Sequence, residues 1–163
     1  MEFRTAAIDD LPVIADIFLR CWTISYKSVL SESARDSFTP ESAAELWRKS
    51  IEIPGDKQTL LLIDGEKAVA VFRIGSDKDD PLRGHLFSLY VDPDSAGRGF
   101  GKSALKEAIE RNRDRGFTQM TLWVFANNDI ANSLYSKSGF APTGNSRTTP
   151  EWGALEIELI AAL

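Results

Sequence analysis

The chain has 163 residues, 43% of them hydrophobic, with 19 basic and 24 acidic residues and a formal net charge of −5. This length predicts one domain, residues 1–163, that is large enough to bury a core. The acidic balance argues against a nucleic-acid-binding protein whose affinity comes from phosphate neutralisation. A single cysteine, no long apolar run and no basic leader favour a reducing, cytoplasmic setting and no membrane partner.

The first half of the chain predicts one strand, two helices and a hairpin. Pro12 and Pro40 each follow a capping residue and suit the first turn of a helix, where the missing N–H removes no hydrogen bond. Asp64-Gly65 between two apolar runs is a strong hairpin signal. The elements expected, in chain order, are a strand over 2–5, helices from about 11 and over about 40–51, and strands over 60–63 and 68–74.

The second half predicts two strand–helix units and a mixed α/β fold class. Glycine followed by phenylalanine ends each helix, at Gly116 and Gly139, as is typical of a Schellman C-cap. β-Branched and aromatic residues over 118–125 predict a strand between the helices. The elements expected are a strand over 85–91, a helix from the following glycines to Gly116, the strand over 118–125, a helix from Asn128 or Asp129 to Gly139, a Pro/Gly/Thr-rich connection and a last strand over about 154–160.

Three alternating glycines, Gly97, Gly99 and Gly101, lie directly ahead of the first of these helices. Glycine lets the backbone turn through positive φ, and it lets a ligand approach without a Cβ in the way. The first-turn N–H groups of a helix have no internal partners, and the helix dipole favours an anion at that end. The segment therefore predicts a site for phosphate oxygens at the C-terminal end of the preceding strand.

Other interpretations of this loop are weaker. Residues 96–103, AGRGFGKS, match a relaxed phosphate loop of nucleotide triphosphatases, but residues 92–95 separate them from the strand. No second buried strand ends in an acid free to bind magnesium, so we expect neither ATP turnover nor a metal site. The glycine spacing differs from that of dinucleotide-binding folds. Glycines that only turn a corner remain the structural alternative for the loop taken alone.

Segment 89–140 resembles the cofactor-binding half of the GNAT superfamily of acyl-CoA-dependent N-acyltransferases. The family's Gln or Arg at the start of the loop is Ala96 here, which still supplies its backbone amide. The resemblance implies a mostly antiparallel central sheet with a splayed pair of parallel strands and about four flanking helices. The matching residues are Val91, Pro93, Gly99, Gly101, Asn128, Ala131, Leu134, Tyr135, Gly139 and Phe140.

The resemblance implies that the protein moves an acetyl group from acetyl-CoA, its co-substrate, to a primary amine by direct attack in a ternary complex. It implies that the amides of residues 97–102 hold the pyrophosphate and that the exposed strand over 89–91 pairs with the pantetheine arm. It gives Tyr135 the protonation of the leaving thiolate. The cofactor-binding residues expected are Leu89, Tyr90, Val91, Gly97, Arg98, Gly99, Phe100, Gly101, Lys102 and Asn128.

The general base is open, because the strands over 85–91 and 117–125 contain no acid. His85, the only histidine, is one catalytic candidate, and water leading to bulk solvent is the other route for the proton. We expect the water route, since no acid in these strands is placed to orient His85 or to raise its pKa. A pH profile that loses its acidic limb in His85→Ala would contradict that expectation.

Trp22 and Tyr26 are the candidate acceptor contacts, because the resemblance places acceptor recognition around the first two helices and aromatic faces attract cationic groups. The partner expected is a small-molecule or peptide amine, and a homodimer is compatible with the sequence. A non-catalytic acyl-CoA sensor is the alternative function. Tyr135 argues against it, because a pure binder needs no proton donor at the sulfur.

Overall fold

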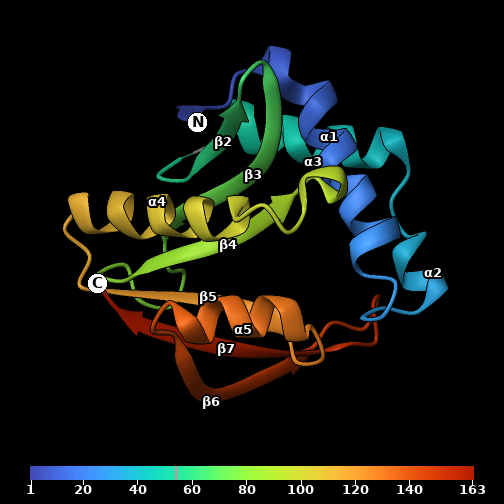
Figure 1. Cartoon of the computed structure of the whole chain (residues 1–163). Coiled ribbons are helices and arrows are strands. Elements are labelled where there is room, and N and C mark those ends of the chain that lie inside the picture. The colour runs from blue at the N-terminus through green and yellow to red at the C-terminus, as the bar shows by residue number, and fades with distance from the viewer. Residues whose placement is uncertain (54) are drawn as a thin grey trace.

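The computed structural model describes residues 1–53 and 55–163. These residues form one 7-stranded sheet with helices on both of its faces (Figure 1). The strands are β1 (Glu2–Thr5), β2 (Gln58–Asp64), β3 (Lys67–Ser76), β4 (Gly84–Val91), β5 (Gln119–Phe125), β6 (Ala141–Thr148) and β7 (Leu155–Ala162). The helices are α1 (Leu11–Arg20), continued by a π-helical turn (Cys21–Ser25), α2 (Glu32–Arg35), α3 (Pro40–Glu52), α4 (Phe100–Asp114) and α5 (Asp129–Lys137).

The strands lie in the order β1-β2-β3-β4-β5-β7-β6. Every neighbouring pair is antiparallel except β4 and β5, which are parallel, so the expected mixed sheet is confirmed. The parallel pairing joins only Gly84–Leu86 to Met120–Leu122. Beyond these residues the two strands diverge, which confirms the expected splayed pair.

A hydrophobic core lies on each face of the sheet, because alternate residues of β2 and β3 point to opposite faces. Leu60, Leu62 and Phe72 lie in the core under α4 and α5. Leu61 and Val71 lie in the core under α1 and α3. Among the described residues no helix has both the length and the apolarity needed to cross a membrane.

The local signals of the sequence placed most elements correctly. The predicted positions of β1 to β5, α1, α3, α4 and α5 are confirmed. Both Schellman caps form as expected: the Phe117 N–H donates to the Asn112 carbonyl at 3.2 Å, and the Phe140 N–H donates to the Tyr135 carbonyl at 3.1 Å. The ends of α4 and α5 are therefore features that short stretches of the sequence encode.

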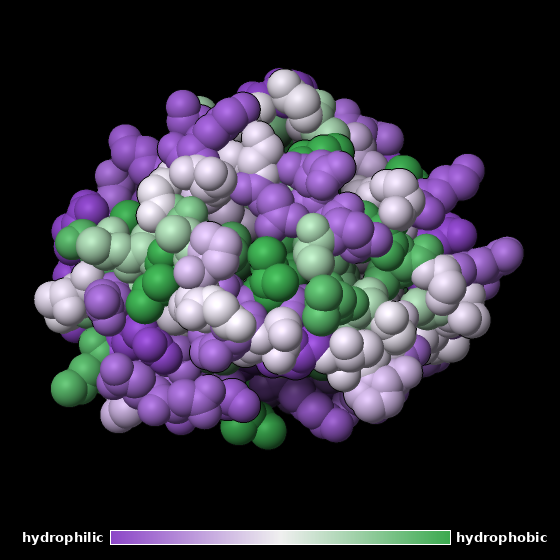
Figure 2. Space-filling view, turned by 90° about the horizontal axis from the view of Figure 1, so that it is seen from below, coloured by the Kyte–Doolittle hydropathy of each residue, from purple (hydrophilic) through white to green (hydrophobic). Residues whose placement is uncertain are grey.

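The prediction of an irregular connection after α5 is wrong, because Ala141–Thr148 forms the edge strand β6, paired antiparallel with β7. All 8 residues of β6 are exposed, so the strand lacks the alternation of apolar and polar residues that would mark it in the sequence. Figure 2 views the molecule from below, the side on which β6 lies in Figure 1, and shows polar side chains with small apolar patches between them. Pairing with β7, rather than local propensity, makes this segment a strand.

Candidate active site

The gap between β4 and β5 begins at a bulge in β4. Ile74 of β3 pairs with Leu86, whereas Arg73 pairs with Ser88, so Phe87 is the extra residue. A bulge bends its strand, and here the bend coincides with the end of the pairing to β5. On the side toward β5, residues 87–91 pair with no strand of the described chain. Their backbone groups form an open edge that an extended ligand can join as an added strand.

The glycine loop lies at the far end of this gap. Gly97 and Gly99 have φ of 76° and 84°, and Gly99 is the left-handed N-cap of α4. Within residues 1–53 and 55–163, the N–H groups of residues 97–102 donate to no acceptor, and the first bonded amide is that of Ser103, which donates to the Gly99 carbonyl at 3.0 Å. Consecutive unpaired N–H groups at a helix N-terminus form an anion site.

The side chains of the loop contribute less than its backbone. Arg98 donates to Asp64 at 3.1 Å, and its guanidinium lies 4.8 Å from the ring centre of Phe100. Phe100 is buried in the core, whereas Lys102 is exposed. Of the residues expected to hold the cofactor here, the structure therefore offers backbone amides from all of them and an exposed cationic side chain from Lys102.

Asp92, which the sequence did not single out, fixes the start of the loop. It is 1% exposed and accepts from Arg20 of α1 at 2.6 Å, while Lys67 of the hairpin lies 2.5 Å away. Burial raises the pKa of this carboxyl, but the bond to Lys67, the Asp94 N–H and the charge of Arg20 outweigh it and hold the pKa below its usual value. The first helix and the glycine loop thus share one ionised anchor.

Tyr135 lies on α5, and Asn128 directly precedes this helix. Tyr135 is buried in the core under α4 and α5, with its ring 5.9 Å from that of Phe140. Burial raises the pKa of Tyr135 to about 12, so the phenol keeps its proton at neutral pH. Asn128 accepts from the Ala131 N–H at 3.2 Å, which confirms it as the N-cap of α5.

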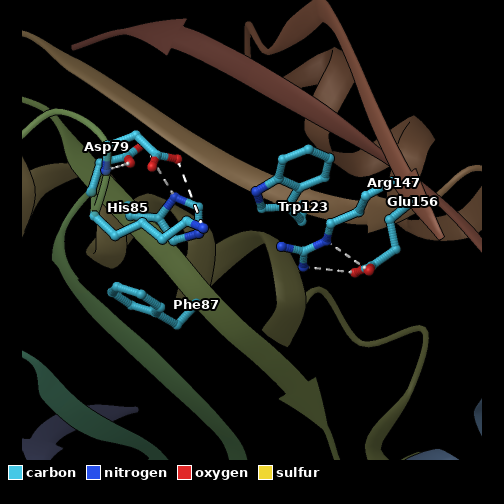
Figure 3. Close-up of a pocket in the computed structure, with 8 residues that line it drawn as sticks. Asp79, His85, Phe87, Trp123, Arg147 and Glu156 are labelled. Carbon is cyan, nitrogen blue, oxygen red and sulfur yellow. Dashed lines mark hydrogen bonds and ion pairs between the residues drawn. The ribbon is translucent and has the colours of Figure 1, made fainter. Parts of the chain in front are cut away.

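A cavity of about 250 Å³ opens on the opposite face of the sheet (Figure 3). Leu86 and Leu122 point into the core under α4, so Phe87 and Trp123, the first residues past the last strand pair, point the other way. Figure 3 shows His85 and Phe87 on one side of the cavity and Trp123, Arg147 and Glu156 on the other. The lining residues are Asp77, Lys78, Asp79, His85, Phe87, Trp123, Arg147 and Glu156.

Two acids of β7 reach the same face, and the sequence analysis did not anticipate them. Trp123 pairs with Glu158, and Phe125 pairs with Glu156. Glu156, 6% exposed, accepts two bonds from Arg147 at 2.9 and 3.2 Å. Neither acid lies in the two central strands, because both belong to β7, which inserts between β5 and β6. Alternation along residues 155–160 was the signal that puts both acids on one face.

The predicted acceptor residues come together with aromatics from distant segments. The Trp22 ring lies 5.7 Å from that of Tyr26 and 5.0 Å from that of Trp152. Trp22 is buried in the core under α1 and α3, whereas Tyr26 is partly exposed and packs on Phe125 at 5.5 Å. A second cavity, of about 500 Å³, adjoins this cluster and is lined by residues 29–31, 126–127 and 152–155.

Comparison with known proteins agrees with this geometry. The family described as Acetyltransferase (GNAT) family matches residues 13–140. Spermidine N(1)-acetyltransferase of Thermoplasma acidophilum is 24% identical over 153 residues, which cover 86% of this chain and 88% of that protein.

Two solved structures show the same fold. The PaiA N-acetyltransferase of Thermoplasma acidophilum in complex with coenzyme A has a TM-score of 0.74 at 21% identity, covering 96% of each chain. The ribosomal-protein-alanine N-acetyltransferase of Brucella melitensis has a TM-score of 0.77 at 18% identity, covering 100% of each chain. The family match over most of the chain shows that this protein belongs to the GNAT acetyltransferase family and is an acetyl-CoA-dependent N-acetyltransferase.

Proposed function

We propose that residues 1–163 act as one domain that acetylates the primary amine of a small molecule or a peptide. The observation that carries this proposal is the gap between β4 and β5, which joins the unpaired amides of residues 97–102 at one end to the cavity beside Phe87 and Trp123 at the other. An extended co-substrate anchored at the loop then has its reactive end at the vertex where the strands meet. The acceptor approaches from the cavity.

The backbone of β4 and the loop hold acetyl-CoA in this proposal. The amides of residues 97–102 bind the pyrophosphate, and the open edge of Leu89, Tyr90 and Val91 pairs with the pantetheine arm. Asn128 adds a polar contact from the start of α5, and Lys102 adds a cation in the first turn of α4. These groups fit an extended ligand with an anionic end, which is what acetyl-CoA presents.

Tyr135 serves as the general acid in the proposed reaction. The amine nitrogen bonds to the thioester carbon, the carbon–sulfur bond breaks, and the departing thiolate needs a proton. A tyrosine phenol is protonated at neutral pH, and burial, which raises the pKa of Tyr135 to about 12, does not change that, so Tyr135 has a proton to supply. This role distinguishes an enzyme from a non-catalytic acyl-CoA sensor.

The acceptor site is proposed for a cationic amine. Three acids, Asp77, Asp79 and Glu156, line the cavity beside two basic residues, Lys78 and Arg147. The Tyr26 ring packs edge-on against Trp22 in the aromatic cluster described above. Carboxylates and aromatic faces both attract ammonium groups. The likeness to a spermidine acetyltransferase supports a small polyamine as the first acceptor to try.

The proposed setting is the cytoplasm, where acetyl-CoA and small amines meet. The net charge of −5 supports an amine partner over a nucleic acid or an anionic membrane surface. All of the site elements described above come from one chain, and a homodimer is compatible with this proposal.

The decisive experiment measures thiol release from acetyl-CoA with a panel of spermidine, diamines, monoamines, amino acids and peptides with free N-termini. Acetylation of at least one amine, confirmed by product mass, is the expected result. Tight acetyl-CoA binding by calorimetry without thiol release on any amine would favour the sensor instead.

A further inference from the structure

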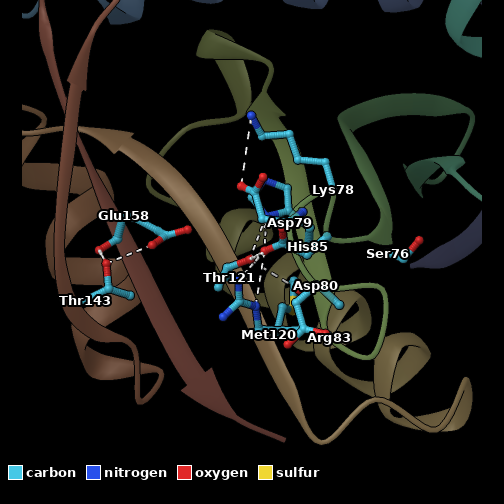
Figure 4. A network of polar contacts seen from close by, with 12 residues as sticks. Ser76, Lys78, Asp79, Asp80, Arg83, His85, Met120, Thr121, Thr143 and Glu158 are labelled. Carbon is cyan, nitrogen blue, oxygen red and sulfur yellow. Dashed lines mark hydrogen bonds and ion pairs between the residues drawn. The ribbon is translucent and has the colours of Figure 1, made fainter.

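His85 takes part in a chain of hydrogen bonds to which the proposed reaction, as described so far, gives no role. Its Nδ1 lies 2.7 Å from Thr121 Oγ1, and Figure 4 shows these two side chains facing each other. Thr121 Oγ1 in turn lies 2.5 Å from Asp77 Oδ2. His85 Nδ1 itself is 3.6 Å from the same carboxylate oxygen, so the hydroxyl is the bridge. The three residues come from β4, β5 and the loop after β3, and all three are buried.

The direction of each bond follows from counting protons. Burial raises the pKa of Asp77, but its bonds from Thr121 and the Asp79 N–H, with the charges of His85 and Arg83, outweigh burial and lower it, so the carboxylate is ionised and can only accept. Thr121 has one hydroxyl proton, which goes to Asp77. The hydroxyl oxygen must then accept from His85, so Nδ1 carries the imidazole proton.

This arrangement leaves the lone pair of His85 on Nε2. Among the described residues Nε2 has no hydrogen-bond partner, and it is not a buried unpaired atom, so it keeps access to the cavity that the ring lines. The position is also relevant to the chemistry. His85 pairs with Thr121 within the last stretch before the strands diverge, and Phe87 beside it already lies past the vertex.

We propose that Asp77 and Thr121 act as positioning residues that fix the Nδ1–H tautomer of His85, so that Nε2 accepts a proton from the acceptor ammonium. This inference rests on the proposed function, and it favours His85 over the water route expected from the sequence. β4 and β5 contain no acid that could orient His85. Asp77, in the loop after β3, takes that role through the hydroxyl of Thr121.

The protons and bonds balance as follows. The ammonium gives one proton to His85 Nε2, and the neutral amine bonds to the acetyl carbon while the carbon–sulfur bond breaks. The thiolate takes a proton from Tyr135, the bound amine nitrogen loses its second proton to restore the phenol, and the imidazolium releases its proton to solvent. The sum is one amide, one thiol and one proton from one ammonium and one thioester.

The charges around His85 allow this role at neutral pH. Burial lowers its pKa, Asp77 and Glu158 raise it, and Arg147 and Arg83 lower it, with a net shift below the usual value. The other charged groups that line the cavity are Lys78, Asp79 and Glu156. The free base therefore predominates at pH 7, and log kcat/KM should rise with pH only through the depressed pKa of His85 and then level off.

The first test reads the tautomer directly, because His85 is the only histidine in the chain. Ring-nitrogen couplings in NMR spectra of protein labelled with ¹⁵N-histidine, recorded without acetyl-CoA, distinguish Nδ1–H from Nε2–H. The expected result near pH 7 is a neutral ring with the proton on Nδ1. A predominantly Nε2–H tautomer would overturn the relay, whatever the activity of the protein.

The second test compares variants of the bridge. Thr121→Val should mix the tautomers and lower kcat/KM by about tenfold or more, whereas Thr121→Ser should restore both. Thr59→Val is the matched control, because Thr59 is a buried threonine of β2 whose hydroxyl donates to the Ser50 carbonyl at 3.4 Å. Equal tautomer populations in Thr121→Val and wild type would contradict the inference.

The third test follows the acidic limb of the pH profile with the best amine. His85→Ala should remove the limb and lower kcat/KM by about a hundredfold. Asp77→Asn removes a charge that raises the pKa of His85, so the limb should move to lower pH. Transfer that keeps the wild-type limb in His85→Ala overturns the inference alone. No transfer to any amine, with the Nδ1–H tautomer intact, overturns the proposed function.

Discussion

The two sides of the vertex between β4 and β5, where their pairing ends at Leu86 and Leu122, present different chemical groups. The side toward α4 offers backbone groups from one continuous stretch, residues 87–102. The opposite side offers side chains from segments far apart in the sequence, among them His85, Trp123, Arg147 and Glu156. One side is therefore specified by where glycines and a bulge occur, and the other by how remote strands meet.

This difference predicts which substitutions each side tolerates. Backbone donors survive a change of side chain, so Ala96 still offers its amide, and Arg98 can bond to Asp64 without loss of a donor from the loop backbone. Side chains such as Glu156 can change without disturbing the loop. We expect variants on the α4 side to alter acetyl-CoA binding and variants in the cavity to alter the choice of amine.

Tyr135→Phe should have the largest effect, because Tyr135 is the one side chain on the α4 side that the chemistry requires. The phenylalanine ring fills the same buried volume, so acetyl-CoA affinity should hold while kcat falls by about a hundredfold, as expected for loss of a general acid. Steady-state kinetics with calorimetry of acetyl-CoA binding measures both. Comparable kcat in the two proteins would assign Tyr135 to the core alone.

Gly99→Val tests the backbone side itself. Gly99 has a φ of 84°, a conformation that costs a residue with a side chain roughly 1–2 kcal/mol. An added Cβ meets no atom of the described chain within 4 Å, so the strain falls on the loop and acetyl-CoA should bind about tenfold more weakly while the fold survives. Calorimetry should show this loss. Unchanged affinity would remove the loop from the site.

Glu156→Gln tests the side-chain side. It keeps the shape of a cavity-lining residue but removes its charge and weakens its two bonds to Arg147. We expect KM for a diamine to rise about fivefold, roughly the 1 kcal/mol typical of a hydrogen bond, with acetyl-CoA affinity unchanged. A variant with weaker acetyl-CoA binding and unaltered amine preference would reverse the assignment of the two sides.

Lys102→Ala should have the smallest effect. The side chain is exposed, and a cation beside a bound phosphate at the surface contributes less than 1 kcal/mol, so acetyl-CoA affinity should fall about twofold. The difference should shrink at high salt. A loss as large as that of Gly99→Val would mean that the loop binds through side chains after all.

The sequence predicted the α4 side well because its signals are local. Gly97, Gly99 and Gly116 each mark a backbone conformation, and the structure confirms the left-handed φ at all of them. The cavity side could not be predicted in the same way. Glu156 reaches it only because β7 inserts beside β5, and Asp77 reaches His85 only because the loop after β3 folds over the sheet. Such contacts depend on tertiary pairing, which no short window of residues encodes.

The short pairing between β4 and β5 has a consequence for the stability of the protein. In the described chain these strands pair only through Gly84–Leu86 and Met120–Leu122, and the rest of the gap is open to a ligand. A ligand that binds only the folded chain adds about 2.7 kcal/mol of stability at a hundred times its Kd. The melting temperature should therefore rise with acetyl-CoA concentration, so that the co-substrate of the reaction also stabilises the fold.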